Sequence, residues 1–517
     1  MRIRPSSRRR FWLADATVVA LVAATVLVLG LTSSTSSGSH DVAGVPAAVT
    51  VNSGTEMPGT RPLPLGFLGI SLEYPAVETY AGNDPQALNP VFEQLIRNLG
   101  PAPELRIGGD SADWTWWPVA GLPQPPGVTF TLDERWLSVT RALAGSLGAR
   151  PILGINLEAA STQVAAAEAS ALTGGIGASS IKAFELGNEP ELYGTFAWYR
   201  TRDGRVVTGR PHDYDFNAFS GDFAAIGAAV SEPPLAGPSF GGLGWIGHLA
   251  EFLGAEPRVR VVTLHRYPLQ LCFTKPASPR YPTIANLLSD RASSGLADGF
   301  VGAVDIAHAH GLPVRIDELN TVACGADAAI SHTFASALWS LDTLFQMARV
   351  GIDGVNIHTF PGAGYELFRF ARAGGRWRGS VAPQYYGLLM FAQAAPPGSR
   401  LLSVSVTGEA GRQLKAWATL AQDRRIRVVL INKLLSRSRS VTLRVPGARG
   451  AASVSLLKAP SIGASSGVTL GGQTLGPSTD TGTLRGRATT DSLRPSGGSY
   501  VVALPAASAA LVTFRTG

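Results

Sequence analysis

Short apolar runs alternate with longer amphipathic stretches between residues 64 and 396. Eight runs have the length of strands and end in polar, glycine or proline residues, at 68–73, 104–110, 151–158, 182–188, 235–239, 258–265, 314–319 and 354–359. Between them, apolar residues recur at three- and four-residue spacing, which predicts helices that include 89–99, 132–147, 216–230, 331–349 and 384–392. Strands that alternate with helices in this way predict an α/β fold, a (β/α)8 TIM barrel over residues 64–396.

The pattern changes near residue 401, where strand-like runs follow one another without helical segments between them. These runs lie at 401–406, 413–419, 426–432, 440–445, 452–457 and 500–504, and glycine and proline separate them. They predict a C-terminal all-β sandwich domain over residues 397–517. The apolar run at 48–52 precedes the barrel, and we expect the segment 46–63 to add a strand to this sandwich.

The N-terminal segment has the pattern of an export signal. Five arginines within residues 1–15 precede an uncharged, mostly apolar run at 16–31 and a Ser/Thr-rich stretch at 32–39. Residues 1–45 are therefore predicted to be a signal peptide, or a short signal anchor, followed by a linker. The run Ser-Arg-Arg-Arg-Phe-Trp at 7–12 resembles the twin-arginine export pattern, and an ordinary basic leader is the alternative. Either reading places the protein outside the cytoplasm, secreted or held at the membrane by this segment alone.

Composition and charge exclude several classes. With 45% hydrophobic and 16% charged residues the chain is globular, and much of its net charge of +7 comes from the leader. No basic stripe or nucleic-acid motif is present, so we expect no nucleic-acid partner. The histidines are scattered and no Cys-x-x-Cys or His-Glu-x-x-His occurs, so no metal site is expected. Cys272 and Cys324 permit one disulfide bond in an oxidising compartment, and two buried thiols are the alternative.

Two glutamates stand where a barrel carries its chemistry, at the C-terminal ends of strands. The fourth run closes with Asn188-Glu189-Pro190, and the seventh run contains Glu318. Two carboxylates that face each other across a barrel mouth suit glycoside hydrolysis, in which one donates a proton while the other attacks or activates water. The competing interpretation is that both are ordinary solvated loop carboxylates.

Arg106 and Glu185 lie within the second and fourth strands, at positions that point inward beneath the rim. Buried charges must be paired, so we expect Arg106 to contact Glu185 or Glu318. Proximity to Glu318 would favour the ionised form of that carboxylate.

Several motifs carry a resemblance to a known family. Asn188-Glu189-Pro190 and Glu318 resemble the barrel glycosidases that retain anomeric configuration. The runs at 69–75, 105–111, 264–269 and 364–368 narrow this resemblance to glycoside hydrolase family 79, the heparanase and β-glucuronidase family, from about residue 46 to the end.

The resemblance implies a double-displacement mechanism that needs no cofactor. Glu189 would be the general acid/base and Glu318 the nucleophile, with carboxyl groups about 5–5.5 Å apart. Asn188 would bind the sugar 2-hydroxyl and Tyr267 would hydrogen-bond the nucleophile. The residues that would contact the ring hydroxyls are Glu73 and Asp110, and those that would support the site are Arg106 and His265.

Gly364 and Tyr365 match the segment that holds the uronate carboxylate in the family, through a backbone N–H and a phenol; a structural turn and a packed ring are the alternative. The preferred hypothesis is a secreted, retaining exo-β-glucuronidase acting on glucuronate-containing glycans or glycosides. The chain lacks the aromatic residue that some members carry after Glu318, and no pair of long basic segments flanks the cleft. An endo-acting heparanase- or hyaluronidase-like enzyme, a neutral-sugar β-glycosidase and a lectin-like binding protein remain alternatives.

Overall fold

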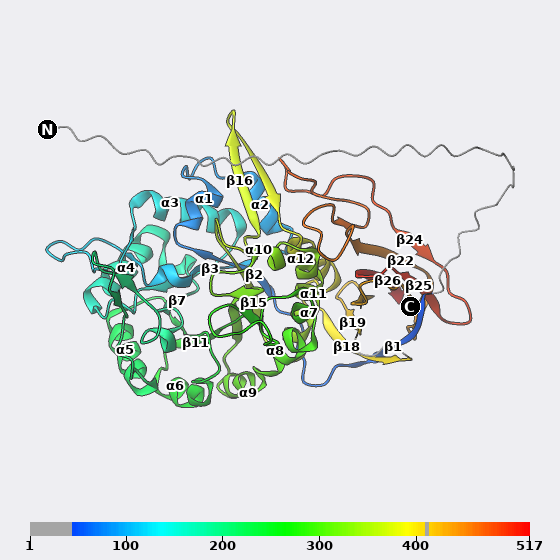
Figure 1. Cartoon of the computed structure of the whole chain (residues 1–517), viewed down its shortest axis with the longest axis horizontal. Helices are drawn as coiled ribbons and strands as arrows, with labels where there is room; N and C mark the ends of the chain where they lie inside the picture. The colour runs from blue at the N-terminus through cyan, green and yellow to red at the C-terminus, as the bar shows by residue number, and fades with distance from the viewer. Residues whose placement is uncertain (1–43, 409–412, 517) are drawn as a thin grey trace, which may run out of the picture. The chain divides into compact units, whose positions relative to one another are not determined.

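The computed structural model describes residues 44–408 and 413–516 (Figure 1). The predicted leader, except for its last two residues, lies outside this part, so its export function stays a prediction. Within the described residues, no helix combines the length and the apolar character needed to cross a membrane.

The eight predicted barrel strands all form and close into one parallel barrel, in the order β10-β11-β13-β15-β2-β3-β6-β7. Their bounds are β2 (Leu68–Glu73), β3 (Glu104–Gly108), β6 (Ile152–Ile155), β7 (Ala183–Leu186), β10 (Leu235–Phe240), β11 (Val259–Arg266), β13 (Val314–Leu319) and β15 (Gly354–Thr359). All residues of β2, β13 and β15 are buried, because helices cover their outer faces and side chains fill the interior.

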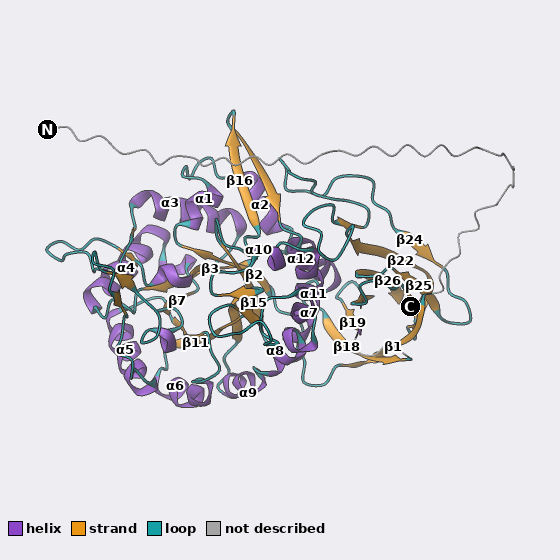
Figure 2. Ribbon diagram, viewed as in Figure 1, coloured by secondary structure: helices purple, strands orange, loops and turns teal. Residues whose placement is uncertain are grey.

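Helices surround the strands (Figure 2). The longer ones are α2 (Pro90–Arg97), α3 (Glu134–Leu147), α4 (Thr162–Ile176), α5 (Phe216–Ala229), α6 (Leu249–Ala255), α9 (Val301–Ala309), α11 (Phe334–Arg349) and α12 (Gln384–Ala394). Asp133 caps α3 by accepting a hydrogen bond from the Trp136 backbone, and Gly148 ends that helix in the left-handed conformation. Helix α11 is buried on every side up to Ala348, since it lies between the barrel and the β domain.

Shorter elements occupy the connecting loops. They are α1 (Ala76–Ala81), α7 (Ile284–Leu287), α8 (Ser294–Asp298), α10 (Ala328–Ser331), β4 (Thr115–Trp116), β5 (Phe130–Thr131), β8 (Tyr199–Arg200), β9 (Val206–Val207), β12 (Leu269–Gln270) and β14 (Val322–Ala323). A hairpin of β16 (Phe368–Ala373) and β17 (Arg376–Val381) follows β15 and extends away from the barrel (Figure 1).

The β domain contains one ten-stranded sheet, in which nine strands follow the order β23-β22-β26-β20-β19-β18-β1-β21-β25 and β24 pairs with β22 off this path. The strands are β1 (Val45–Glu56), β18 (Arg400–Thr407), β19 (Leu414–Leu420), β20 (Arg425–Asn432), β21 (Arg439–Arg444), β22 (Ala448–Lys458), β23 (Thr469–Leu470), β24 (Asp491–Leu493), β25 (Tyr500–Leu504) and β26 (Ser508–Thr516). Strand β1 pairs with β18 and β21, so the N-terminal segment adds a strand to this domain.

Strands from the two halves of this sheet bury side chains in one core. Val49 of β1 and Val502 of β25 share it with Val428 of β20 and Phe514 of β26. The predicted fold class, a (β/α)8 barrel followed by a β-sandwich, is confirmed.

A buried ion pair links α11 of the barrel to the β domain. The Lys433 ammonium lies 2.7 Å from Asp342, and both side chains are almost fully buried. Trp417 donates its indole N–H to the same carboxylate, and its ring stacks on Phe345 at 5.4 Å. Burial raises the pKa of Asp342, but the charge of Lys433 outweighs it and lowers this pKa below its usual value.

We expect Lys433→Met to lower the free energy of unfolding by about 3–5 kcal/mol, because it leaves the Asp342 charge buried without its partner. The double variant Lys433→Met/Asp342→Asn should recover a large part of this loss, since it removes both charges. Denaturant unfolding measures both effects. Equal destabilisation by the single and double variants would contradict the ion-pair account.

Candidate active site

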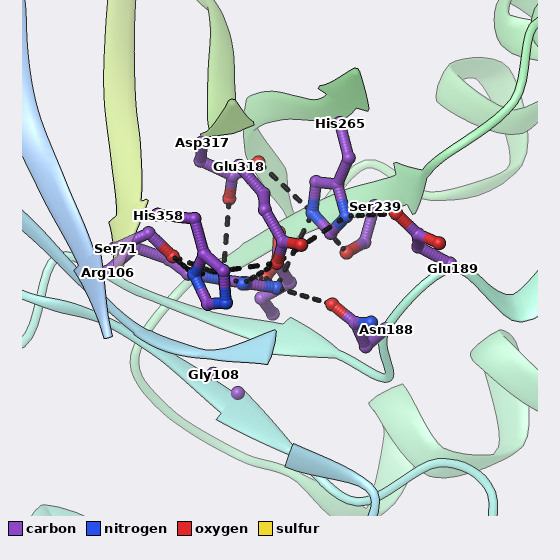
Figure 3. A network of polar contacts seen from close by, with 12 residues as sticks. Ser71, Arg106, Gly108, Asn188, Glu189, Ser239, His265, Asp317, Glu318 and His358 are labelled. Carbon is purple, nitrogen blue, oxygen red and sulfur yellow. Dashed lines mark hydrogen bonds and ion pairs between the residues drawn. The ribbon is translucent and has the colours of Figure 1, made fainter. Parts of the chain in front are cut away.

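A buried guanidinium holds the centre of the site together (Figure 3). Arg106 on β3 is fully buried, and its Nη1 donates to Glu318 Oε2 at 2.7 Å. Its Nε donates to Glu185 Oε2 at 2.8 Å and its Nη2 to Asn188 Oδ1 at 2.9 Å. Arg106 therefore contacts both carboxylates that the sequence offered as its partners. A Cβ at Gly108 would lie 2.8 Å from Arg106 Nε, so only glycine leaves room for the guanidinium there.

Several side chains surround the Glu318 carboxylate at the end of β13. Besides the contact with Arg106, its Oε1 accepts a hydrogen bond from the Tyr267 hydroxyl at 2.9 Å. His265 and His358 each bring a ring nitrogen to about 4 Å from Oε2, at 4.0 and 3.9 Å. Burial raises the pKa of Glu318, but the nearby cationic groups and the tyrosine outweigh it and lower the pKa to about 2. This carboxylate is therefore ionised at neutral and mildly acidic pH.

Glu189 occupies a different environment. It follows β7 in the left-handed conformation, at φ 50°, and about a fifth of its side chain is exposed. Its carboxylate packs against the backbone of Gly241, where a Cβ would lie 2.2 Å from Glu189 Cδ. Oxygen atoms of Glu189 and Glu318 lie within 4.8 Å of each other, with His265 Nδ1 at 3.3 Å from Glu189 Oε1. The two carboxylates therefore face the same small volume.

His265 lies beneath both carboxylates. Its Nδ1 faces Glu189, while its Nε2 lies 3.4 Å from Asp317 and 3.1 Å from the Ser239 hydroxyl. Burial lowers the pKa of His265, but the charge of Glu318 and the hydrogen bonds to Asp317 and Glu189 raise it well above its usual value. A protonated imidazole in this position donates a hydrogen bond from each ring nitrogen to an acceptor on each side.

Asp317 and Glu185 lie below His265. Their negative charges balance the positive charges of Arg106 and His265. Burial raises the pKa of Glu185 to about 7, although Arg106 opposes the shift. Burial also raises the pKa of Asp317, but His265 outweighs it and holds this pKa below its usual value. Glu185, His265 and Asp317 have ligand atoms within 4.8 Å, as a metal site needs. The Arg106 guanidinium and the protonated His265 already supply positive charge there, which disfavours a metal ion.

The remaining predicted residues line the opposite side of the mouth. Glu73 accepts a hydrogen bond from the Ser111 backbone at 2.8 Å and lies 3.2 Å from His358. Asp110 is exposed to the cleft and accepts a hydrogen bond from Asn188 at 3.1 Å. Enclosure by protein groups, and then the charge of Glu73, raise the pKa of Asp110 well above its usual value.

Gly364 and Tyr365 lie in the loop that follows β15. The Tyr365 hydroxyl is 3.4 Å from the Tyr267 hydroxyl, which in turn donates to Glu318. A Cβ at Gly364 would lie 2.8 Å from Ala326, so glycine allows this loop to pack against the loop after β13. Among the described residues, the Gly364 N–H meets no acceptor and is available to a ligand.

Asp113 organises the loops around Asn188. Its carboxylate accepts hydrogen bonds from the backbone of Leu157 and Asn188 and from the Tyr193 hydroxyl. His358 was missed, although it lies near the end of the eighth strand, where the strand-end rule applied to glutamates could have found it. Asp317, next to Glu318 in sequence, belongs to the buried charged groups below the Glu318 carboxylate.

The predicted disulfide bond between Cys272 and Cys324 is present. Next to it, β12 pairs with β14. The loop after β11 and the loop after β13 are therefore joined by backbone hydrogen bonds and by the disulfide bond. Both loops border the site, because they follow the strands that carry His265 and Glu318.

The sequence of the chain is similar to those of known proteins. Residues 416–511 match the family described as glycosyl hydrolase family 79 C-terminal beta domain. A β-glucuronidase of Neurospora crassa is 23% identical over 420 residues, which is 71% of this chain and 71% of that protein.

Solved structures share the fold. The 4-O-α-L-rhamnosyl-β-D-glucuronidase of Fusarium oxysporum 12S has 22% identity and a TM-score of 0.66, with 90% of this chain and 100% of that chain covered. The family 51 arabinofuranosidase of Xanthomonas axonopodis pv. citri has 15% identity and a TM-score of 0.64, with coverage of 91% and 100%.

A closed barrel with two facing carboxylates at its mouth, together with these relatives, defines a glycoside hydrolase. Its β domain carries the family match, and the chain's resemblance to glycoside hydrolase family 79 is confirmed.

We expect Tyr267→Phe to raise the pKa of Glu318, because the lost hydroxyl favours the ionised carboxylate. A hydrogen bond to a charged group is worth about 1.5–3 kcal/mol, or about one to two pH units. The acidic limb of kcat/KM should therefore move to higher pH by this amount. Tyr214→Phe is the matched control, since its hydroxyl binds Asp222 outside the site. An acidic limb that is the same in Tyr267→Phe and in the control would show that Tyr267 does not tune the nucleophile.

Proposed function

We propose that the protein is an exported exo-β-glucuronidase that retains anomeric configuration and removes terminal β-linked glucuronic acid from glycans or glycosides. The observation that carries this proposal is the pair of unequal carboxylates. Glu318 is buried and held ionised by Arg106, whereas Glu189 is partly exposed and lies within 4.8 Å of it. Different environments for two neighbouring carboxyl groups are what a nucleophile and a proton donor require.

In the first step, a Glu318 oxygen attacks the anomeric carbon and the bond to the leaving group breaks. Glu189 gives its proton to the departing oxygen, which leaves a covalent glycosyl-enzyme. In the second step, Glu189 takes a proton from water, whose oxygen displaces Glu318 from the anomeric carbon. The distance of no more than 4.8 Å supports this course, because inverting enzymes separate their carboxyl groups by about 6.5–9.5 Å to admit water.

The uronate is assigned to the loop after β15. The free Gly364 N–H and the Tyr365 hydroxyl are neutral donors, and hydrogen bonds to a carboxylate are about twice as strong as those between neutral groups. Burial and the charge of Glu73 raise the pKa of Asp110, which lessens the negative charge that would oppose an acidic sugar. Two of the relatives are named glucuronidases.

Export is proposed from the basic and apolar N-terminal pattern, and the Cys272–Cys324 disulfide is consistent with an oxidising compartment.

A neutral-sugar β-glycosidase is the second candidate. Glu73 and Asp110 bring acidic groups to the side of the mouth opposite Glu189, and acidic groups there suit hydroxyls better than another anion. The two assignments share Glu189 and Glu318 and differ only in what Gly364 and Tyr365 contact.

We expect 4-nitrophenyl β-glucuronide to be hydrolysed in preference to the matching β-glucoside and β-xyloside, with Glu318→Gln as the inactive control. Initial rates of nitrophenol release measure this, and proton NMR gives the configuration of the first-formed sugar, which should be β. Preference for a neutral sugar would reject the Gly364 and Tyr365 assignment. No turnover of any of the three would reject exo action in favour of an endo-acting enzyme or a lectin-like protein.

A further inference from the structure

Three large apolar side chains are exposed on loops at the mouth of the barrel. Phe196 follows β7 and is 38% exposed, while Leu271 and Phe273 follow β11 and are 38% and 63% exposed. The rings of Phe196 and Phe273 meet edge to face at 5.6 Å, so the two loops touch. These three residues are called the apolar rim patch below. Exposed apolar groups that cluster in this way commonly mark a contact surface.

The patch stands on the arc of the barrel that holds Glu189. Strands β7, β10 and β11 are consecutive neighbours, and Glu189 follows β7, packs against Gly241 after β10 and faces His265 on β11. Most of the residues assigned to the sugar ring, Glu73, Asp110, Gly364 and Tyr365, follow β2, β3 and β15 on the other side of the barrel, whereas Asn188, assigned to the 2-hydroxyl, directly precedes Glu189. Because a proton donor must face the oxygen of the leaving group, side chains above its own arc border the leaving group.

The patch is also fixed in place. Phe273 directly follows Cys272, which the disulfide joins to the loop after β13. Phe196 is held by a hydrogen bond from its backbone N–H to the carbonyl of Leu192, at 3.0 Å. A preformed apolar surface binds at a lower entropic cost than a mobile loop.

We infer that the apolar rim patch is the leaving-group subsite, and that it takes an aglycone with an aromatic or apolar face. The inference rests on the proposed function and adds the class of aglycone to it. Aromatic groups on Phe196 and Phe273 would stack with a phenolic or polycyclic aglycone, and Leu271 would extend the contact. Arg266 and Arg280 lie in the same segment of the chain, so an acidic aglycone is the competing occupant.

The test compares phenyl with 2-naphthyl β-glucuronide, whose phenols have similar acidity but different apolar area. Wild-type kcat/KM should favour the naphthyl compound. Phe273→Ala should lower kcat/KM for the naphthyl compound about three- to tenfold, the range expected for one aromatic contact, and change the phenyl compound less than twofold. Leu65→Ala is the matched control, because Leu65 is 59% exposed just before β2, at the opposite ends of the strands.

A second measurement distinguishes the loss of the subsite from general damage to the fold. Hydrolysis of the glycosyl-enzyme occurs after the aglycone has left, so kcat for a substrate limited by this step should be unchanged in Phe273→Ala. A damaged fold would lower that kcat and the rates for both aglycones together, which would overturn the inference.

Phenyl and 2-naphthyl β-glucosides are measured in parallel. Turnover of the glucosides alone would reject the proposed sugar, and the naphthyl preference and its loss in Phe273→Ala would still test the patch. Equal rates for both aglycones on the sugar that is turned over would overturn the inference and leave the proposed function standing. The inference would also be overturned if 6-sulfo-2-naphthyl β-glucuronide were hydrolysed faster than the 2-naphthyl compound and its rate declined with salt. That result would assign the subsite to an acidic group.

Discussion

The Arg106 guanidinium is the interaction on which the site depends. It is fully buried on β3 and joins Glu185 of β7 to Glu318 of β13, which lie far apart around the barrel. A buried cation without such partners would be strongly destabilising, and the carboxylates without the cation equally so. Charge balance at the centre of the barrel therefore fixes the position of the Glu318 carboxylate. The absence of a side chain at Gly108 is part of the same arrangement.

The difference between the two glutamates follows from their distance to this centre. Glu318 lies within it, and the neighbouring His358, His265 and Arg106, together with the Tyr267 hydroxyl, lower its pKa to about 2. Glu189 lies at the margin, on a left-handed residue beyond β7, where it contacts His265 but not Arg106. One barrel thus places two carboxyl groups with different surroundings side by side. The mouth of the barrel is divided in a similar way. Glu73 and Asp110 follow β2 and β3 on one side, and the apolar rim patch follows β7 and β11 on the other.

Much of this could be predicted from the sequence, because apolar periodicity and strand ends are local signals. Strands β2, β13 and β15 have the predicted bounds, and Arg106 lies where strand alternation placed it. Strand β26 was missed because its first half is rich in alanine, which has a low strand preference. The contacts of Asp113 and His358 depend on loops and strands that are distant in sequence, and no local pattern encodes them.

Trapping the covalent intermediate tests the central claim most directly. The protein is incubated with 2-deoxy-2-fluoro-β-glucuronosyl fluoride, digested and examined by mass spectrometry. The account predicts one fluoroglucuronosyl group per chain, bound to the peptide that contains Glu318, and no such adduct in Glu318→Gln. An adduct on Glu189 or Glu185, or hydrolysis of a normal substrate with inversion and no adduct, would contradict it.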